Sequence, residues 1–495
     1  MLASACVAAS PGPAAAAPPV FGHALKDRFA MDPALTNLNQ GSYGVVANAV
    51  ADFQQALLKR VERNPEKWFR VGFDGPVPAP GPGVPAGCTA EFQCALTAAR
   101  KELGAFLGAH ADDLVFVDNA SEGVNVALRS LARFMPGGSA APRPGTHGPA
   151  AHSRNGILHL DLAYGMVKDC VHFLSGNGIG GRANASHTTP AVPLVVEVDT
   201  AAAYPSYDAD AIVALVEAAI LANARDAAAG SGSAVPRIGI ASFSHIVSVP
   251  GIVLPIARLA ALCRAHGILT LVDGAHAPGQ IALDVEALGA DVYVGNGHKW
   301  LFTARGCAFV WIAPHVQQLI YPQVIEAFPG YPTEGGGGGG NSSGPVVPVT
   351  TPYPGALHSM FDWQGTKDYS GFLSLSAALE FRRSIGGEAA IIAYTHGLAV
   401  RGGQMLARAW GTQTMPAAVT GQLINVELPC NPGCPVDGLA DRLYRKGGFW
   451  VPVVMLPEGA ATRSAWLRIS VGVYSEMADL ELVRDTVLEV LGQKA

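Results

Sequence analysis

The amino-acid sequence predicts an α/β fold, with a large domain built on a mostly parallel β-sheet and a smaller α+β domain after it. Between about residues 114 and 300, short apolar runs alternate with longer amphipathic segments, the pattern of parallel strands joined by helices. Hydrophobic residues make up 49% of the 495 residues and charged residues 15%, so the chain can bury a large core. From about residue 370 the alternation gives way to two helical segments followed by strands.

The expected elements of the large domain follow in order along the chain. Hydrophobic residues at helical spacing predict helices over 45–70 and about 90–108, and Gly108 ends the second of them. A short apolar run then predicts a strand over 114–117, before a polar turn that opens a helix near Glu122. The alternation continues with strands at 156–160, 193–198, 237–243, 267–273 and 291–294 and with helices at 164–173, 208–225 and 255–266.

Several segments rich in glycine, proline, serine or asparagine interrupt this pattern and are predicted as insertions or loops, at 75–87, 175–188, 226–233 and 333–350. The elements expected after them are helices at 371–384 and 389–410 and strands at 421–428 and 466–471. We therefore divide the chain into a disordered tail or presequence (1–25), a large α/β domain (26–365) and a small α+β domain (366–495).

Charge and hydropathy argue against a nucleic-acid-binding protein and a membrane protein. A net charge of −6 without a block of lysine or arginine argues against a nucleic-acid partner. No run of 18 apolar residues occurs, so we expect no membrane partner. The first 20 residues are rich in alanine and proline and uncharged, which suits a disordered tail or, except for the missing arginine, an organellar presequence. We expect a cytoplasmic protein, with the chloroplast or mitochondrion as the alternative.

The eight cysteines are scattered, and a chain of this size needs no disulfide staples, so a reducing compartment is the default. Cys430 and Cys434 form a close pair that invites comment. A lone CxxxC without nearby histidine or cysteine is typical of a loop rather than a zinc site, and we expect no bound metal.

Asp273 and Lys299 mark the expected active site. Each follows a short apolar run that predicts a strand, and ligands of open α/β sheets bind where the carboxyl ends of the strands meet. An aspartate and a lysine at that edge suit pyridoxal phosphate (PLP), because the lysine can form a Schiff base and the carboxylate can keep the pyridine nitrogen protonated. Burial and a nearby pyridinium should lower the pKa of Lys299. Either residue alone would be more typical of a solvated lysine or a helix cap.

Further positions suit the same cofactor and an amino-acid substrate. Ala120 and Ser121 open a helix directly after a strand, where free N–H groups attract a phosphate, although an ordinary serine cap gives the same pattern. Arg468 lies between apolar residues in a strand, so its guanidinium needs a substrate carboxylate or an internal salt bridge. Tyr164 ends another strand, where an aromatic ring either packs in the core or covers the cofactor ring.

Six short segments carry these and neighbouring residues in a fixed order, namely Asn37–Gly44, Val117–Gly123, Val272–Ala277, Gly297–Trp300, Trp363–Tyr369 and Leu467–Ser470. Together they resemble the class V aminotransferase-like PLP enzymes of fold type I. The branch most similar to them includes isopenicillin N epimerases and plant L-cysteine desulfhydrases. Any one segment is a weak signal, whereas six in order over about residues 35–490 are specific.

The resemblance implies roles around the cofactor. His298 would add a donor to the phosphate, and Tyr164 would stack on the ring. Gly365 and Thr366 resemble the segment that reaches the phosphate from the neighbouring subunit, which implies a homodimer with the site at the subunit interface.

The resemblance also points to the substrate side of the site. Asn39 resembles a residue near the substrate, and His276 and Ser248 are weaker candidates for contacts on the side of the cofactor's phenolic oxygen. Relatives commonly carry histidine or asparagine where this chain has Gln40.

These residues predict an enzyme that acts on a small amino acid, with Lys299 as the base that removes the Cα proton. β-Elimination, epimerisation and transamination all remain open at that point. The resemblance favours β-elimination from cysteine or a related sulfur amino acid, a sulfoxide included, with an epimerase or a non-catalytic PLP-fold scaffold as alternatives. A persulfide-forming desulfurase is not expected, because no cysteine lies between Cys307 and Cys430, unless Cys88 or Cys94 substitutes.

Overall fold

The computed structural model describes residues 20–69, 91–134, 156–176, 194–228, 237–325, 356–457 and 462–492. The insertions expected at 75–87 and 333–350 lie outside these residues, as does the greater part of those at 175–188 and 226–233. Residues 1–19 of the expected tail lie outside them too.

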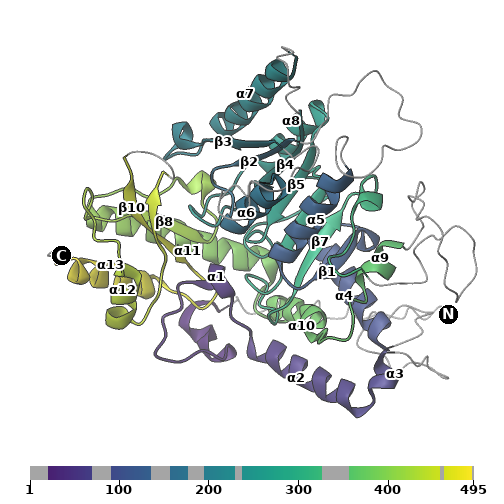
Figure 1. The fold of residues 1–495 in the computed structure, drawn as a ribbon. Coiled ribbons are helices and arrows are strands. Elements are labelled where there is room, and N and C mark those ends of the chain that lie inside the picture. The colour runs from purple at the N-terminus through teal and green to yellow at the C-terminus, as the bar shows by residue number, and fades with distance from the viewer. Residues whose placement is uncertain are drawn as a thin grey trace, which may run out of the picture.

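A seven-stranded sheet forms the centre of the large domain, in the order β1-β7-β6-β5-β4-β2-β3 (Figure 1). The strands from β6 to β3 in that order pair in parallel, whereas β7 runs antiparallel to both β6 and β1. All strands except the edge strand β3 are almost wholly buried, which explains why they read as unbroken apolar runs. The prediction of a mostly parallel sheet is confirmed. The strands are β1 (Leu114–Val117), β2 (Gly156–Leu160), β3 (Val195–Val198), β4 (Ile238–Ser244), β5 (Leu269–Gly274), β6 (Val292–Asn296) and β7 (Ala308–Ile312).

Helices pack on this sheet as the alternating pattern predicts. Helix α5 contacts β1, β5, β6 and β7, while α8 lies against β5, and α7 packs on α8 and β3. On the N-terminal side, α10 packs against α2 and α4 (Figure 1). The helices are α2 (Asn48–Arg63), α3 (Pro65–Phe69), α4 (Glu91–Leu107), α5 (Ala120–Phe134), α6 (Gly165–Leu174), α7 (Ala209–Ala228), α8 (Ile256–Ala265), α9 (Ala356–Phe361) and α10 (Ser370–Ser384).

Several features of the large domain differ from the sequence-based expectation, among them helix α9, which was not predicted. The single helix expected over 45–70 is two helices, because Pro65 has no N–H group and begins a new helix after Arg63. Strand β7 was not predicted, since an apolar run of five residues shows no periodicity by which to recognise it.

The smaller unit near the C-terminus is α+β, as predicted. Its antiparallel sheet has the order β8-β10-β9, and α11 and α13 pack beside it. Strand β9 and helices α12 and α13 were not among the expected elements. The elements are α11 (Gly387–Trp410), β8 (Leu423–Glu427), α12 (Leu439–Gly447), β9 (Val453–Leu456), β10 (Ser464–Ser470) and α13 (Met477–Val490).

The described residues also answer the questions of a membrane span, a bound metal and a disulfide. Within the described ranges, none of the helices combines the length and apolarity that a membrane span requires. The same residues bring no three His, Cys, Asp or Glu side chains together in a way that could hold a metal ion. Cys430 and Cys434, in the loop after β8, are joined by a disulfide that the sequence did not predict.

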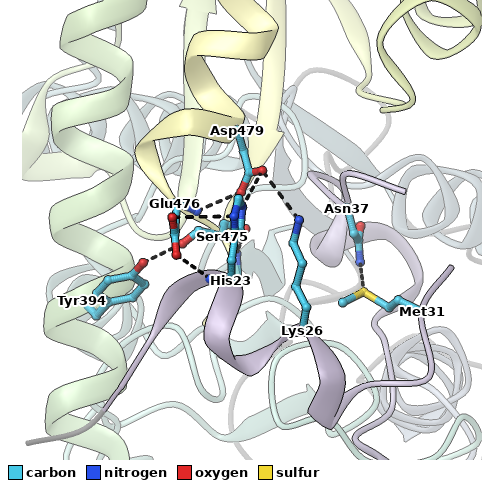
Figure 2. Close-up of polar contacts among 9 residues, drawn as sticks. His23, Lys26, Met31, Asn37, Tyr394, Ser475, Glu476 and Asp479 are labelled. Atoms are coloured by element: carbon cyan, nitrogen blue, oxygen red, sulfur yellow. Dashed lines mark hydrogen bonds and ion pairs between the residues drawn. The ribbon is translucent and has the colours of Figure 1, made fainter. Parts of the chain in front are cut away.

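The N-terminal segment packs on the C-terminal unit. The 3₁₀ helix η1 (Gly22–Arg28) lies against the start of α13, where the His23 Nε2 atom is 2.9 Å from Asp479 Oδ1 and the Lys26 Nζ atom is 3.9 Å from the same oxygen (Figure 2). The His23 backbone N–H donates to Glu476 Oε1 at 2.6 Å. These contacts join η1 to the start of α13, and the short helix α1 (Gln40–Tyr43) lies further along the same N-terminal segment.

Asp479→Ala should destabilise the protein by about 1–2 kcal/mol. The Asp479 carboxylate accepts the Glu476 backbone N–H at 2.8 Å, which caps α13, and it also receives His23 and Lys26. Urea unfolding measures the loss. Asp485→Ala on the same helix is the control, because Asp485 is exposed and pairs with its neighbour Arg484, so less than about 0.5 kcal/mol should change. Equal effects of the two substitutions would contradict the prediction.

Candidate active site

Lys299 and Asp273 lie at the carboxyl edge of the sheet, on neighbouring parallel strands. Asp273 is in β5 and pairs with Val294 of β6, and Lys299 follows the end of β6 by three residues. Burial lowers the pKa of the Lys299 amine to about 8, while the charge of Asp273 raises it and that of Arg468 lowers it. The neutral, nucleophilic amine is therefore accessible near physiological pH.

His276 is in contact with the lysine amine. The Lys299 Nζ atom and the His276 Nε2 atom lie 3.0 Å apart, within hydrogen-bonding distance. Burial, with the charges of Lys299 and Arg468, holds the pKa of His276 well below its usual range, so the imidazole is neutral. Its second nitrogen, Nδ1, is buried without a hydrogen-bond partner among the described residues. A buried polar atom of this kind is available to a ligand.

Asp273 is a buried carboxylate in need of a cation. Its Oδ1 atom accepts the Ala275 backbone N–H at 3.0 Å, and its backbone oxygen accepts the His245 N–H at 2.8 Å. Burial raises the pKa of Asp273, and the Lys299 charge offsets this only in part. A protonated ring nitrogen beside the carboxylate would favour its ionised form.

Arg468 is the centre of a clamp made of neutral groups. One terminal nitrogen donates to the Ser248 backbone oxygen at 2.9 Å and to its hydroxyl at 3.2 Å. The other donates to Asn39 Oδ1 and Ser42 Oγ, both at 2.9 Å. Burial lowers the pKa of Arg468 to about 10, opposed by Tyr164.

Within the described residues, no carboxylate pairs with the charge of Arg468. Arg468 forms no salt bridge with any described carboxylate, and its buried Nε atom lacks a hydrogen-bond partner in the same part of the chain. Of the two partners expected from the sequence, an internal salt bridge is therefore not formed within the described residues. A buried cation with a free donor suits the carboxylate of an amino acid.

The first turn of α5 is held by two asparagine side chains, that of Asn296 at the end of β6 and that of Asn119 just before the helix. The backbone N–H of Ala120 donates to Asn296 Oδ1 at 2.9 Å, and the Glu122 N–H donates to Asn119 Oδ1 at the same distance. Ser121 lies between these two bonds, at the start of the 15-residue helix α5. The helix dipole, together with the N–H and hydroxyl of Ser121, makes this turn suitable for a phosphate.

Asn296→Ala is expected to raise the dissociation constant for PLP about five- to tenfold. The substitution leaves the buried Ala120 N–H without its acceptor and frees the turn that should hold the phosphate. Titration of the PLP-free protein with PLP, followed by visible absorbance, measures the change. Asn125→Ala is the control, because Asn125 lies one turn further along α5 and donates to the Ser121 backbone oxygen. An unchanged dissociation constant in Asn296→Ala would argue against a phosphate at this turn.

Other predicted site residues have the following positions. His298 Nδ1 lies 3.0 Å from the Cys307 backbone oxygen, and burial lowers the pKa of His298 to about 4. Tyr164 is half-exposed at the N-terminus of α6, near enough for its charge to influence the pKa of Arg468. Ser248 contacts Arg468 in this structure. Their contacts with the cofactor stay predictions.

Gly365 and Thr366 lie in a loop before α10 that is tied to the turn ahead of α5. Gly365 has φ +87°, in the left-handed region that favours glycine, and its oxygen accepts the Tyr369 hydroxyl at 2.7 Å. Lys367, the next residue after Thr366, forms an ion pair with Asp118 at 2.6 Å. Within the same loop, the Lys367 amine also donates to Gln364 Oε1 at 3.1 Å. The contact of Gly365 and Thr366 with a phosphate in the neighbouring subunit stays a prediction.

The sequence analysis assigned no contact to three residues that the structure places at the site, although it noted Gln40 as a departure from relatives. Ser42 binds Arg468, Asn296 binds the turn of α5, and Gln40 donates to the Lys299 backbone oxygen at 2.5 Å. Each belongs to a segment that was already recognised, or directly precedes one. The residues themselves could be noted from the sequence, but nothing in the sequence indicated which residue each side chain would contact.

The described residues fit PLP. Lys299 offers an amine, Asp273 a carboxylate in need of a cation, and His276 an unpaired buried nitrogen. Ser121, in the first turn of α5, offers donors to a phosphate, and Arg468 offers a free guanidinium N–H to the substrate.

Comparisons with known proteins agree with this geometry. A protein of Oryza sativa subsp. japonica, named as a candidate L-cysteine desulfhydrase, is 31% identical over 353 residues, which are 67% of this chain and 63% of the rice protein. Isopenicillin N epimerase of Amycolatopsis lactamdurans is 26% identical over 94% of this chain and 97% of its own length. The apo structure of a cysteine desulfurase from Thermococcus onnurineus has the same fold, with a TM-score of 0.65, 14% identity, and coverage of 96% of this chain and 98% of the desulfurase.

The family model for class V aminotransferases matches residues 231–483. This range is just over half of the chain and includes β5, β6 and β10, the strands that carry or precede Asp273, Lys299 and Arg468. The model begins well after Asn39 and Ser42, which complete the clamp from the N-terminal segment. The protein belongs to the class V aminotransferase family.

Proposed function

We propose that this protein is a PLP-dependent C–S lyase that acts by β-elimination on cysteine or a related sulfur amino acid. The observation that carries the proposal is the buried, unbalanced charge of Arg468 beside a lysine whose pKa is lowered to about 8. This pair binds an amino acid by its carboxylate and offers a base to its Cα proton. The likeness to the rice protein supports cysteine as the first substrate to test.

Different residues of the chain orient the substrate and transfer the proton. Arg468 orients the substrate through its carboxylate, and Asn39 and Ser42 fix the guanidinium. Lys299 takes the Cα proton, and neutral His276 at 3.0 Å is placed to accept a hydrogen bond from the resulting ammonium. When bound, PLP supplies the electron sink that makes the Cα proton acidic. Loss of the sulfur group from Cβ and uptake of one water would convert cysteine into pyruvate, ammonia and sulfide.

A persulfide mechanism is not supported by the described thiols. Cys94, Cys170, Cys263 and Cys307 are all buried. Burial raises the pKa of Cys170 and Cys263 to about 11 and that of Cys307 to about 12, which keeps these thiols protonated and unreactive. Direct elimination needs no such nucleophile. Cys88, the other candidate, lies outside the described residues.

The test is an assay of the PLP-loaded protein on L-cysteine and on a cysteine S-oxide conjugate, with PLP-free protein as control. Pyruvate and a sulfur product in equal amounts, dependent on PLP, are the expected result. The same samples are examined for D-cysteine. Inversion at Cα without pyruvate would replace the lyase by an epimerase, and PLP binding without any change in either substrate would contradict both.

We also propose a homodimer in which the Gly365–Thr366 loop of one subunit reaches the phosphate of the other. The left-handed conformation of Gly365 and the Lys367–Asp118 ion pair give this loop a fixed shape beside the turn ahead of α5. Light scattering should give twice the mass of 51.1 kDa. A mixture of two inactive variants, one altered at Lys299 and one at Thr366, should regain part of the activity. A monomer with full activity would contradict the proposal.

A further inference from the structure

Gln40 lies between the turn that carries Lys299 and the segment after β10, and its side chain contacts both. Its side chain is fully buried, at 0% exposure, in the short helix α1. The amide nitrogen donates to the Lys299 backbone oxygen at 2.5 Å, and the amide oxygen accepts the Tyr474 hydroxyl at 2.8 Å. Both ends of the amide are thus used, one on the lysine turn and the other on the segment that follows β10.

The hydrogen bonds run in one direction through this amide. Asn37 Nδ2 donates to the Tyr474 hydroxyl at 2.8 Å, the hydroxyl donates to Gln40, and Gln40 donates to Lys299 O. Figure 2 shows Asn37 in the segment that leads from η1 toward α1. Each of these groups donates a hydrogen to the next one. The series of hydrogen bonds therefore favours one arrangement of the side chains and resists small shifts of any of them.

The neighbours of Gln40 hold the substrate clamp. Asn39 and Ser42 each accept from Arg468 at 2.9 Å, and the Ser42 hydroxyl donates to Asn39 Oδ1 at 2.8 Å. One turn of chain, from Asn39 to Ser42, therefore contacts the guanidinium through two side chains and the lysine backbone through a third.

Close packing prevents this turn from moving alone. A Cβ atom at Gly44 would overlap the His298 backbone oxygen, and one at Gly41 would lie 3.1 Å from both the Trp300 ring and Ser470 Oγ. The Ser470 N–H donates to the Leu38 oxygen at 2.7 Å. A displacement of the turn must therefore pass to the residues on either side of Lys299.

We propose that Gln40 is a positioning residue that couples the Arg468 clamp to the lysine turn, so that the substrate carboxylate and the Lys299 amine keep a fixed separation. The inference rests on the proposed function, because it assumes an amino-acid substrate held by Arg468. It assigns Gln40 no contact with substrate or cofactor. Its effect passes through the backbone at Lys299 and through Asn39 and Ser42.

Gln40→Met tests the coupling, because methionine has a similar length and no charge but cannot form either hydrogen bond. Gln422→Met is the matched control. Gln422 is also buried, at 2% exposure, and its amide donates to a backbone oxygen, that of Gly279, at 3.0 Å, but it contacts neither Lys299 nor Arg468 among the described residues.

Two measurements need no turnover, so they stay valid if the lyase activity itself fails. The first is the pH midpoint of the visible absorbance of the PLP-loaded protein, which reports on Lys299. The second is the dissociation constant of propionate, a carboxylate without an amine, which reports on Arg468. In Gln40→Met we expect the midpoint to move by about half a unit or more and propionate to bind about fivefold more weakly, with neither change in Gln422→Met.

A change in only one of the two measurements, or equal changes in the control, would overturn the coupling. Should Gln40→Met fail to fold, Tyr474→Phe removes just the hydroxyl that holds the Gln40 oxygen. Smaller changes of both measurements in that variant would support the proposal, and a folded Tyr474→Phe protein identical to the original would overturn it.

Discussion

Lys299→Ala is expected to lower kcat for elimination by about 10³- to 10⁴-fold, the largest effect of any single substitution. In the proposed mechanism the amine both attaches the cofactor and accepts the Cα proton, and no other described side chain is placed to do both. His276, 3.0 Å away, is neutral with a strongly lowered pKa and is a weak base. Pyruvate and sulfide release at saturating PLP measures the loss.

Lys59→Ala is the control for this experiment, because Lys59 is exposed on α2 and outside the site. It should leave kcat unchanged. A Lys299→Ala protein that keeps a tenth of the original activity at saturating PLP would show that another group removes the proton, and the assignment of the base would be wrong.

Arg468→Gln is expected to lower kcat/KM by about 10- to 100-fold, mainly through KM. The substitution removes the charge that we propose binds the substrate carboxylate, while glutamine can still contact Ser248 or Asn39. Steady-state kinetics with L-cysteine measure the change. Arg468→Lys keeps the charge but loses the bidentate contact, so its kcat/KM should lie between those of the original protein and Arg468→Gln. A lowered kcat at unchanged KM would contradict a role in substrate binding.

The same variant has an expected effect on pH dependence. The neutral form of Lys299 reacts with PLP, so the rate of PLP uptake by the PLP-free protein should rise with pH through about 8. The Arg468 charge lowers the pKa of Lys299, and its removal should raise that pKa. The midpoint of the uptake profile should therefore move to higher pH in Arg468→Gln. A midpoint that moves to lower pH would show that the two charges do not interact as the structure indicates.

Local patterns predicted the centre of the fold well. The predicted strand at 114–117 and that at 156–160 have the observed bounds of β1 and β2, because wholly buried strands leave unbroken apolar runs between turns. Gly108 was expected to end a helix, and α4 ends at Leu107 with Gly108 at φ +65°. Asp273 and Lys299 could be paired from sequence because each directly follows a predicted strand of one sheet.

Contacts between distant segments could not be predicted in the same way. The partners of Arg468 lie 220 to 429 residues away in sequence, at Ser248, Ser42 and Asn39. Only the pairing of β10 with β8 and the docking of α1 bring them together. The same holds for Gln40 and Lys299, which are 259 residues apart. A sequence shows that a buried arginine needs a partner, but the fold selects it.

The clamp joins residues from both ends of the chain, and this has a consequence for its synthesis. Asn39 and Ser42 are synthesised well before Arg468, which follows Ser42 by 426 residues. Domains tend to fold from the N-terminus as they emerge, so the sheet with Lys299 can form while Asn39 still lacks its partner. A messenger truncated before β10 would thus encode a chain that keeps Lys299 but lacks Arg468, the residue proposed to bind the substrate carboxylate.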